Sequence, residues 1–289
     1  MDMTEIDKIK QGSWWRRNRD NATSMFAATP AMLFLSLLYL LPMVLLLSQS
    51  FEGSSLQHYR KALTDGLYVQ VLLETLMIAA YVCIACFVIG YPVAYFLSIA
   101  PGVWSTLGMI FVLLPFWTSI LVRTYGWMVI LGRNGIINRT LLHTGIIDTP
   151  LALMNNITGV VIGMVHVLLP YMIFPLYAVM RRMDKGLAMA AEGLGASGWQ
   201  VFTKIYFPLT LPGVLAGVTL VYVLAIGFFI TPALLGGGKV PMIAVLIEQQ
   251  VHTFLNWGFA SALSLVLLTA TLAVYAVLRR VLRGNMQWT

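Results

Sequence analysis

Residues 187–208 read LAMAAEGLGASGWQVFTKIYFP and separate two long apolar segments of the chain. The stretch is rich in alanine and glycine, and it is too polar to span a bilayer. Asp184 is a candidate N-cap for a helix that begins at Lys185. Apolar residues then recur at the spacing i, i+3, i+4 and i+7, which predicts a short helix with one apolar stripe made of Leu187, Ala190, Ala191 and Leu194.

A second short helix is predicted directly after the first, beyond a joint made of Gly193, Gly195 and Gly198. Ser197 and Gln200 form an S-x-x-Q capping box at its start. Its apolar stripe is Trp199, Phe202 and Tyr206. The narrow alanine face of the first helix fits a groove on another protein, whereas a helix that lies on lipid would carry bulky apolar residues and lysines. The loop is therefore interpreted as a docking element for a partner protein.

The composition is that of a membrane protein. Of the 289 residues, 59% are hydrophobic and 10% are charged, whereas a soluble domain carries about 25% charged residues. Six apolar segments are long enough to span a bilayer, which takes about 20 residues: 27–48, 71–97, 105–131, 157–180, 209–235 and 259–281. In the fifth segment, Gly213 and Gly217 form a G-x-x-x-G pair that allows close approach of another helix, most simply one of the same chain.

The lysines and arginines predict the topology. Twelve of the eighteen lie at the two termini and in the loop after the fourth segment, and five lie on the opposite side. By the positive-inside rule, both termini and the loop at 181–207 are cytoplasmic. The expected fold is all-α with six transmembrane helices, N-in and C-in. It comprises a basic cytoplasmic segment (1–25), one transmembrane domain (26–283) with its cytoplasmic loop (181–207), and a short tail (284–289).

No catalytic or metal-binding constellation emerges from the sequence. The GGGKV run at 236–240 lacks two features of a phosphate-binding P-loop, because Ala233 replaces the first glycine and Val240 replaces the hydroxyl residue. The four histidines are scattered without metal-ligand spacing, and Cys83 and Cys86 are interpreted as small packing residues. We expect no enzymatic activity, cofactor, metal or nucleic-acid partner.

Carboxylates are scarce in the apolar segments. Glu74 starts the second segment at its outer end, and Glu248 lies in the last outer loop. Transport coupled to protons or sodium usually needs carboxylates within the membrane. This shortage weighs against an ion-coupled secondary transporter and indicates another source of energy.

The 187–208 stretch resembles the EAA loop of permease subunits of ATP-binding-cassette importers. That loop reads E-A-A, three residues, G, nine residues, and I-x-L-P. The corresponding residues here are Met189, Ala190, Ala191, Gly195, and Ile205 to Pro208, with every interval correct. Met189 stands where the family has glutamate, and Phe207 where it has leucine. Other runs, namely GYPVAYFLS (90–98), LLPFWTSILVRTYGWMVILG (113–132) and ITPALLGGG (230–238), resemble the first permease subunit of spermidine- and putrescine-type importers.

This resemblance implies a type I importer in the bacterial inner membrane. A second permease subunit would complete the pathway through the lipid bilayer, cytoplasmic ATP-binding subunits would supply energy, and a periplasmic binding protein would deliver the substrate. The resemblance also assigns contacts with the ATPase to Met189, Ala190, Ala191, Leu194, Gly195, Ile205 and Pro208.

The substrate is less sharply defined than the class. A pathway for a polyamine cation needs carboxylates and aromatic faces, and candidate pathway residues are Trp117, Arg123, Tyr125, Trp127, Phe228 and Phe229. Arg123 would repel a polyamine unless it is paired, so an amino-acid-like, opine-like or phosphonate substrate stays open. An ion-coupled secondary transporter and a non-transporting membrane scaffold are the alternatives from other classes.

Overall fold

A computed structural model of the chain describes residues 29–30, 32–51 and 56–285, and the predicted cytoplasmic segment 1–25 lies outside these residues. Every regular element in the described part is helical. The chain divides into two compact units, 1–55 and 56–289. In the first unit, an apolar helix over Met32–Ser50 corresponds to the first predicted span.

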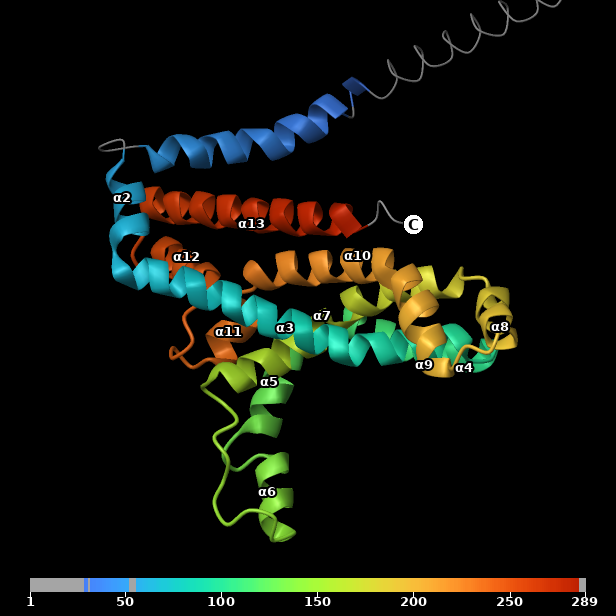
Figure 1. The fold of residues 1–289 in the computed structure, drawn as a ribbon. Coiled ribbons are helices and arrows are strands. Elements are labelled where there is room, and N and C mark those ends of the chain that lie inside the picture. Colours follow the sequence, from blue (N-terminus) through green and yellow to red (C-terminus); the bar gives the residue numbers. More distant parts are fainter. Residues whose placement is uncertain (1–28, 31, 52–55, 286–289) are drawn as a thin grey trace, which may run out of the picture. The chain divides into compact units, whose positions relative to one another are not determined.

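The second unit holds the remaining helices, which Figure 1 shows in sequence colours. Their bounds are α2 Gln57–Thr64, α3 Gly66–Ile99, α4 Gly102–Leu113, η1 Leu114–Trp117, α5 Ile120–Leu131, α6 Ile136–His143, α7 Ile157–Arg181, α8 Lys185–Gly193, α9 Gly198–Val201, η2 Phe202–Tyr206, α10 Phe207–Ile226, α11 Ile230–Leu235, α12 Ile243–His252 and α13 Trp257–Asn285.

The centre of this unit is the packing of α3, α7 and α10 against one another. Glycines let α10 approach α7 closely. A Cβ atom at Gly213 would lie 3.0 Å from the carbonyl oxygen of Pro175, and one at Gly217 would lie 3.2 Å from that of Met172. Packing at backbone distance is typical of membrane helices, which gain little from hydrophobic association in lipid. The prediction that the G-x-x-x-G pair packs within the chain is confirmed.

Among the described residues, five helices are long and apolar enough to cross a membrane, and a bent pair makes a sixth span if it is counted as one. The bent pair replaces the single helix expected over 105–131. It consists of Gly102–Trp117 and Ile120–His143, which meet at an angle of 100°. Pro115 lies just before this break, and a proline both removes a backbone donor and obstructs the preceding helical turn.

The fifth predicted segment, 209–235, also needs correction. Its helix α10 ends at Ile226, and a separate short helix, α11, begins at Ile230. Gly227 follows the end of α10, and Pro232 lies in the first turn of α11, where its missing N–H costs no helical hydrogen bond. Two of the predicted spans are therefore discontinuous, and their second parts, α5 and α11, pack against each other.

Candidate functional site

The loop at 181–207 folds as the two short helices that its sequence predicts. The carboxylate of Asp184 accepts a hydrogen bond from the backbone N–H of Gly186 at 2.8 Å and so caps α8. At the start of α9, Gln200 accepts a hydrogen bond from the N–H of Ser197 at 2.9 Å, which completes the capping box. Between the helices, Gly195 has a φ of +87°, in the left-handed region that side chains other than glycine rarely adopt. The predicted glycine joint is confirmed.

The loop exposes apolar side chains that the rest of the described chain does not cover. Leu194, at the end of α8, is 90% exposed. Met189 and Trp199 are each more than half exposed. Ala190 and Gly195 are also exposed, whereas Ala191 is half-buried. A group of uncovered apolar side chains indicates an interaction surface. We call Met189, Ala190, Leu194 and Trp199 the exposed loop face.

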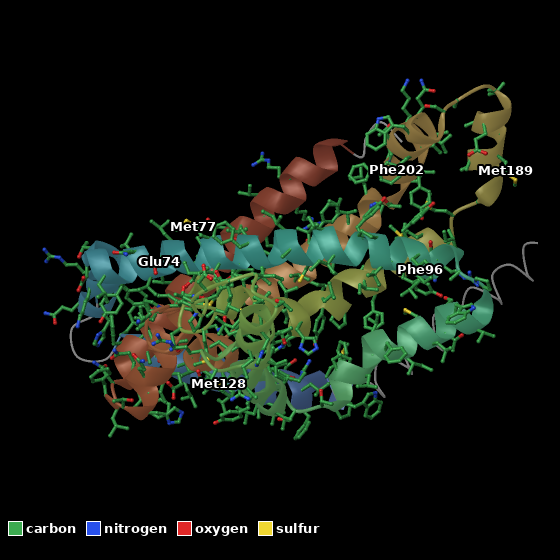
Figure 2. All side chains as sticks on the ribbon, turned by 90° about the horizontal axis from the view of Figure 1, so that it is seen from below. Glu74, Met77, Phe96, Met128, Met189 and Phe202 are labelled. Carbon is green, nitrogen blue, oxygen red and sulfur yellow. The ribbon has the colours of Figure 1, made fainter. Side chains whose placement is uncertain are left out.

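The second short helix continues into α10 without a break, through the π-helical turn η2. Ile205 and Pro208 are half-buried within this continuous helix, so they position the loop rather than extend its exposed face. Aromatic rings link the same helix to α3. Phe202 stacks on Tyr206 with ring centroids 6.3 Å apart, and Tyr206 meets Tyr95 edge-on at 5.2 Å. In Figure 2, Met189 marks α8, Phe202 marks the start of η2, and Phe96 marks the adjoining end of α3.

A cavity of about 370 Å³ separates α8 from the ends of the long helices. Its lining includes Tyr95 and Ser98 of α3, Arg181 of α7, Leu187 and Glu192 of α8, and Phe202. The guanidinium of Arg181 donates a hydrogen bond to the carbonyl oxygen of Ser98 at 3.2 Å, which joins α7 to α3 beside the cavity. The first short helix contacts α9 and η2, and the cavity leaves room for it to shift.

The second group of candidate residues lies at the two helix breaks. Trp117 ends η1 and is 90% exposed, and Tyr125 of α5 is also exposed. Phe228 and Phe229 lie between α10 and α11, half-buried and exposed respectively. Because α11 packs against α5, the structure brings the residues of both breaks to one region.

Two side chains of α5 face inward at this region. The indole N–H of Trp127 donates to Nδ1 of His166 on α7 at 3.0 Å, so His166 joins two helices. Arg123 is half-buried, and its Nε atom is buried without a hydrogen-bond partner in the described residues. Thr124 and Thr231, whose hydroxyl oxygens lie 3.3 Å apart, tie α5 to α11. Sequence patterns give no sign of this threonine pair, because hydroxyl residues in apolar segments have no distinguishing spacing.

Apolar helices long enough to cross a membrane, together with one bent pair and a loop of two short helices, define a multi-pass membrane protein. The sequence matches the family described as "Binding-protein-dependent transport system inner membrane component" over residues 8–285. The chain belongs to this family, and it is a multi-pass protein of the inner membrane. Membership of this family favours a component of a binding-protein-dependent transport system over an ion-coupled secondary transporter or a membrane scaffold.

Two relatives are similar along most of the chain. The "Spermidine/putrescine transport system permease protein PotB" of Escherichia coli (strain K12) is 41% identical over 213 residues, which cover 74% of this chain and 77% of that protein. The protein of the same name in Haemophilus influenzae is 38% identical over 262 residues, covering 86% of this chain and 91% of that protein.

A solved structure shows the same fold. It is described as "Crystal structure of bacterial alginate ABC transporter in complex with alginate pentasaccharide-bound periplasmic protein". One of its chains superposes with a TM-score of 0.75 at 14% sequence identity, covering 91% of this chain and 95% of that chain. The expected fold class, an importer permease of type I, is confirmed.

Proposed function

We propose that this chain is a permease subunit of an ATP-driven importer for a polyamine such as putrescine or spermidine. It forms half of the translocation pathway, and a second permease subunit forms the other half. A periplasmic binding protein delivers the substrate, and separate cytoplasmic ATP-binding subunits hydrolyse ATP. The observation that carries the proposal is the similarity of most of the chain to two spermidine/putrescine permeases, combined with an exposed loop face on the predicted cytoplasmic side.

The loop supports a mechanical role in this scheme. The ATPase contacts assigned to Met189, Ala190, Ala191, Leu194 and Gly195 lie on or beside α8, whereas Ile205 and Pro208 lie in the helix that carries motion into the membrane. Closure of the ATPase subunits pushes α8 toward the cavity behind it. The continuous helix from α9 to α10 and the ring contact between Tyr206 and Tyr95 pass this movement to α10 and α3. Rigid helices then change their packing by hinge or shear motion.

The helix breaks before α5 and α11 support a position for the translocation pathway. Backbone that leaves the helical conformation within a membrane is tolerated where it is covered by protein or lines a water-filled space. Aromatic side chains at both breaks provide faces for an ammonium group. We assign Trp117, Arg123, Tyr125, Trp127, Phe228 and Phe229 to the surroundings of this pathway. The permease itself performs no covalent chemistry.

Reconstitution tests the proposal. The chain is purified from its native membrane, and the co-purifying proteins are identified by mass spectrometry. We expect a second permease and an ATP-binding protein. The complex in proteoliposomes, supplied with its binding protein, should take up labelled spermidine or putrescine, and a hydrolysis-deficient ATPase should abolish this uptake. Uptake that persists without hydrolysis would contradict the proposal, and competition by a phosphonate or an amino acid, but not by polyamines, would reassign the substrate.

A further inference from the structure

The long helix α3 has two different faces. One face is buried against α7, α10 and α12 and includes Thr75, Ile78 and Val82. On the other, exposed side chains recur at alternating spacings of three and four residues, which is one face of an α-helix. Four of them, Met77, Tyr81, Ile84 and Val88, are each more than half exposed. Within residues 56–285, no helix covers this face of α3.

Glu74 lies on the exposed face, one turn before Met77. It is half-buried, and it is the only acidic residue in the described helices that are long and apolar enough to cross the membrane. Its carboxylate accepts a hydrogen bond from the side-chain amide of Gln70 at 2.9 Å, and no described lysine or arginine pairs with it. Ionisable side chains on spanning helices are rare, and they often mark substrate pathways.

The length of α3 places Glu74 at the outer edge of the membrane. The helix has 34 residues, so it is about 51 Å long at a rise of about 1.5 Å per residue, against a hydrocarbon core of about 30 Å. Glu74 is about 12 Å from the helix start, which is near the boundary of that core if the helix is centred in it. Tyr81 lies about 10 Å deeper along the same face. Figure 2 shows Glu74 and Met77 near one end of α3 and Phe96 near the other.

We propose that Gln70, Glu74, Met77 and Tyr81, which we call the Glu74 face, bind an ammonium group of the substrate at the outer entrance of the pathway. This inference rests on the proposed polyamine substrate, but it is independent of the residues assigned at the helix breaks. The negative charge of the Glu74 carboxylate favours a cationic ligand at this face. A carboxylate forms a charge-assisted hydrogen bond with an ammonium, and the exposed ring of Tyr81 offers a cation–π contact for a second amine further along.

Gln70 has a positioning role in this arrangement. Its amide donates to one carboxylate oxygen and leaves the other free for the ligand. The pair is spaced by four residues on one helix, so both side chains lie on the same side of α3. The carboxylate is thereby held on the exposed face, where a cation arriving from the outer compartment can reach it.

The test uses the complete transporter in proteoliposomes, with spermidine as the probe and with the binding protein at saturation. Glu74→Gln keeps the size of the side chain but removes its charge, and we expect the initial uptake rate to fall about tenfold, the loss of one hydrogen bond to a charged group. Glu74→Asp should retain most of the rate. Asp148→Asn, which neutralises an exposed carboxylate of the outer loop, is the matched control and should leave uptake unchanged.

Wild-type uptake by Glu74→Gln, with equal amounts of transporter in the membrane, overturns the inference while the proposed function stands. If the wild-type transporter takes up no polyamine, the proposed function fails instead, and the two failures are thus distinguished.

Chemical labelling identifies what covers the Glu74 face. Met77→Cys is treated with a membrane-impermeant, cationic thiol reagent, and the wild-type protein gives the background because Cys83 and Cys86 are buried. We expect labelling from the outer side that binding protein loaded with spermidine suppresses. Absence of labelling would indicate lipid, and labelling that spermidine leaves unchanged would indicate an unoccupied surface. Either result overturns the inference.

Discussion

Trp127 of α5 donates a hydrogen bond to Nδ1 of His166 on α7, with the two nitrogen atoms 3.0 Å apart. A second polar contact, between Thr124 and Thr231, joins α5 to α11. Both contacts hold the part of the third span that follows its break. In a membrane interior, where no water replaces a lost partner, such contacts fix a helix that its own backbone no longer connects rigidly to the preceding one.

The first prediction concerns this contact. Trp127→Phe keeps an aromatic ring but removes the indole donor, which leaves Nδ1 of His166 without its partner. We expect a loss of about 1 kcal/mol in the free energy of unfolding and reduced uptake. Thermal unfolding in detergent measures the first effect. Trp117→Phe is the control, because Trp117 is 90% exposed and its loss should leave thermal stability unchanged. Equal destabilisation by both variants would show that the hydrogen bond has no special weight.

The second prediction concerns the approach of α11 to α7. A Cβ atom at Gly163 would lie 2.5 Å from Cδ1 of Leu235 and 2.7 Å from Cγ2 of Thr231. Gly163→Val therefore has to displace the buried side chains of Leu235 and Thr231, and overpacking of this kind costs about 1–3 kcal/mol. The melting temperature should fall accordingly. Gly126→Val inserts the same side chain where a Cβ atom would have no neighbour within 4 Å, and an equal loss in this variant would contradict the packing argument.

Local signals explain why the two short helices of the loop could be predicted from the sequence. Asp184 caps α8, and Ser197 with Gln200 caps α9, because each signal acts within three residues of the helix start. The left-handed conformation at Gly195 belongs to the same class of short-range feature. The contact of the loop residues with an ATPase stays a prediction, because capping and backbone signals do not identify a partner.

The helix breaks and the contacts across them were not predicted, for two physical reasons. The predicted apolar segments continue through Thr118 and Gly227 although the helices do not, so the apolar pattern does not mark the breaks. The contact between Trp127 and His166 joins residues 39 positions apart, and periodicity carries no information about such pairs. Pro115 was the available signal, but a proline inside a membrane span is compatible with a continuous helix as well.

The third prediction concerns the joint of the loop. Gly195 has a φ of +87° and has space around its Cα, since a Cβ atom there would have no neighbour within 4 Å. Backbone conformation, rather than a clash, therefore penalises Gly195→Ala, by about 1 kcal/mol. We expect this variant to recover less ATPase on co-purification than Gly195→Asn, because asparagine adopts the left-handed conformation more readily. Gly193→Ala also meets no neighbour and has an ordinary φ, so it should bind the ATPase normally.

The fourth prediction concerns Leu194, the most exposed side chain of the exposed loop face. A leucine that is 90% exposed contributes little to the stability of the isolated chain, so Leu194→Ala should unfold at the wild-type temperature. If Leu194 enters a groove on the ATPase, its truncation removes a buried anchor and should cost about 1–2 kcal/mol of association free energy, which weakens ATPase binding about tenfold. Binding of the purified ATPase to immobilised permease in detergent measures this change.

The control is Ile146→Ala, which truncates a 70% exposed apolar side chain in the loop between α6 and α7, on the opposite side of the membrane in the predicted topology. It should bind the ATPase like the wild type. If Leu194→Ala and Ile146→Ala bind equally, Leu194 is not an anchor. If both variants bind the ATPase weakly, the loss of binding is nonspecific and Leu194 is not an anchor. In that case Leu194→Ser, which changes polarity as well as size, should bind the ATPase no more weakly than Leu194→Ala.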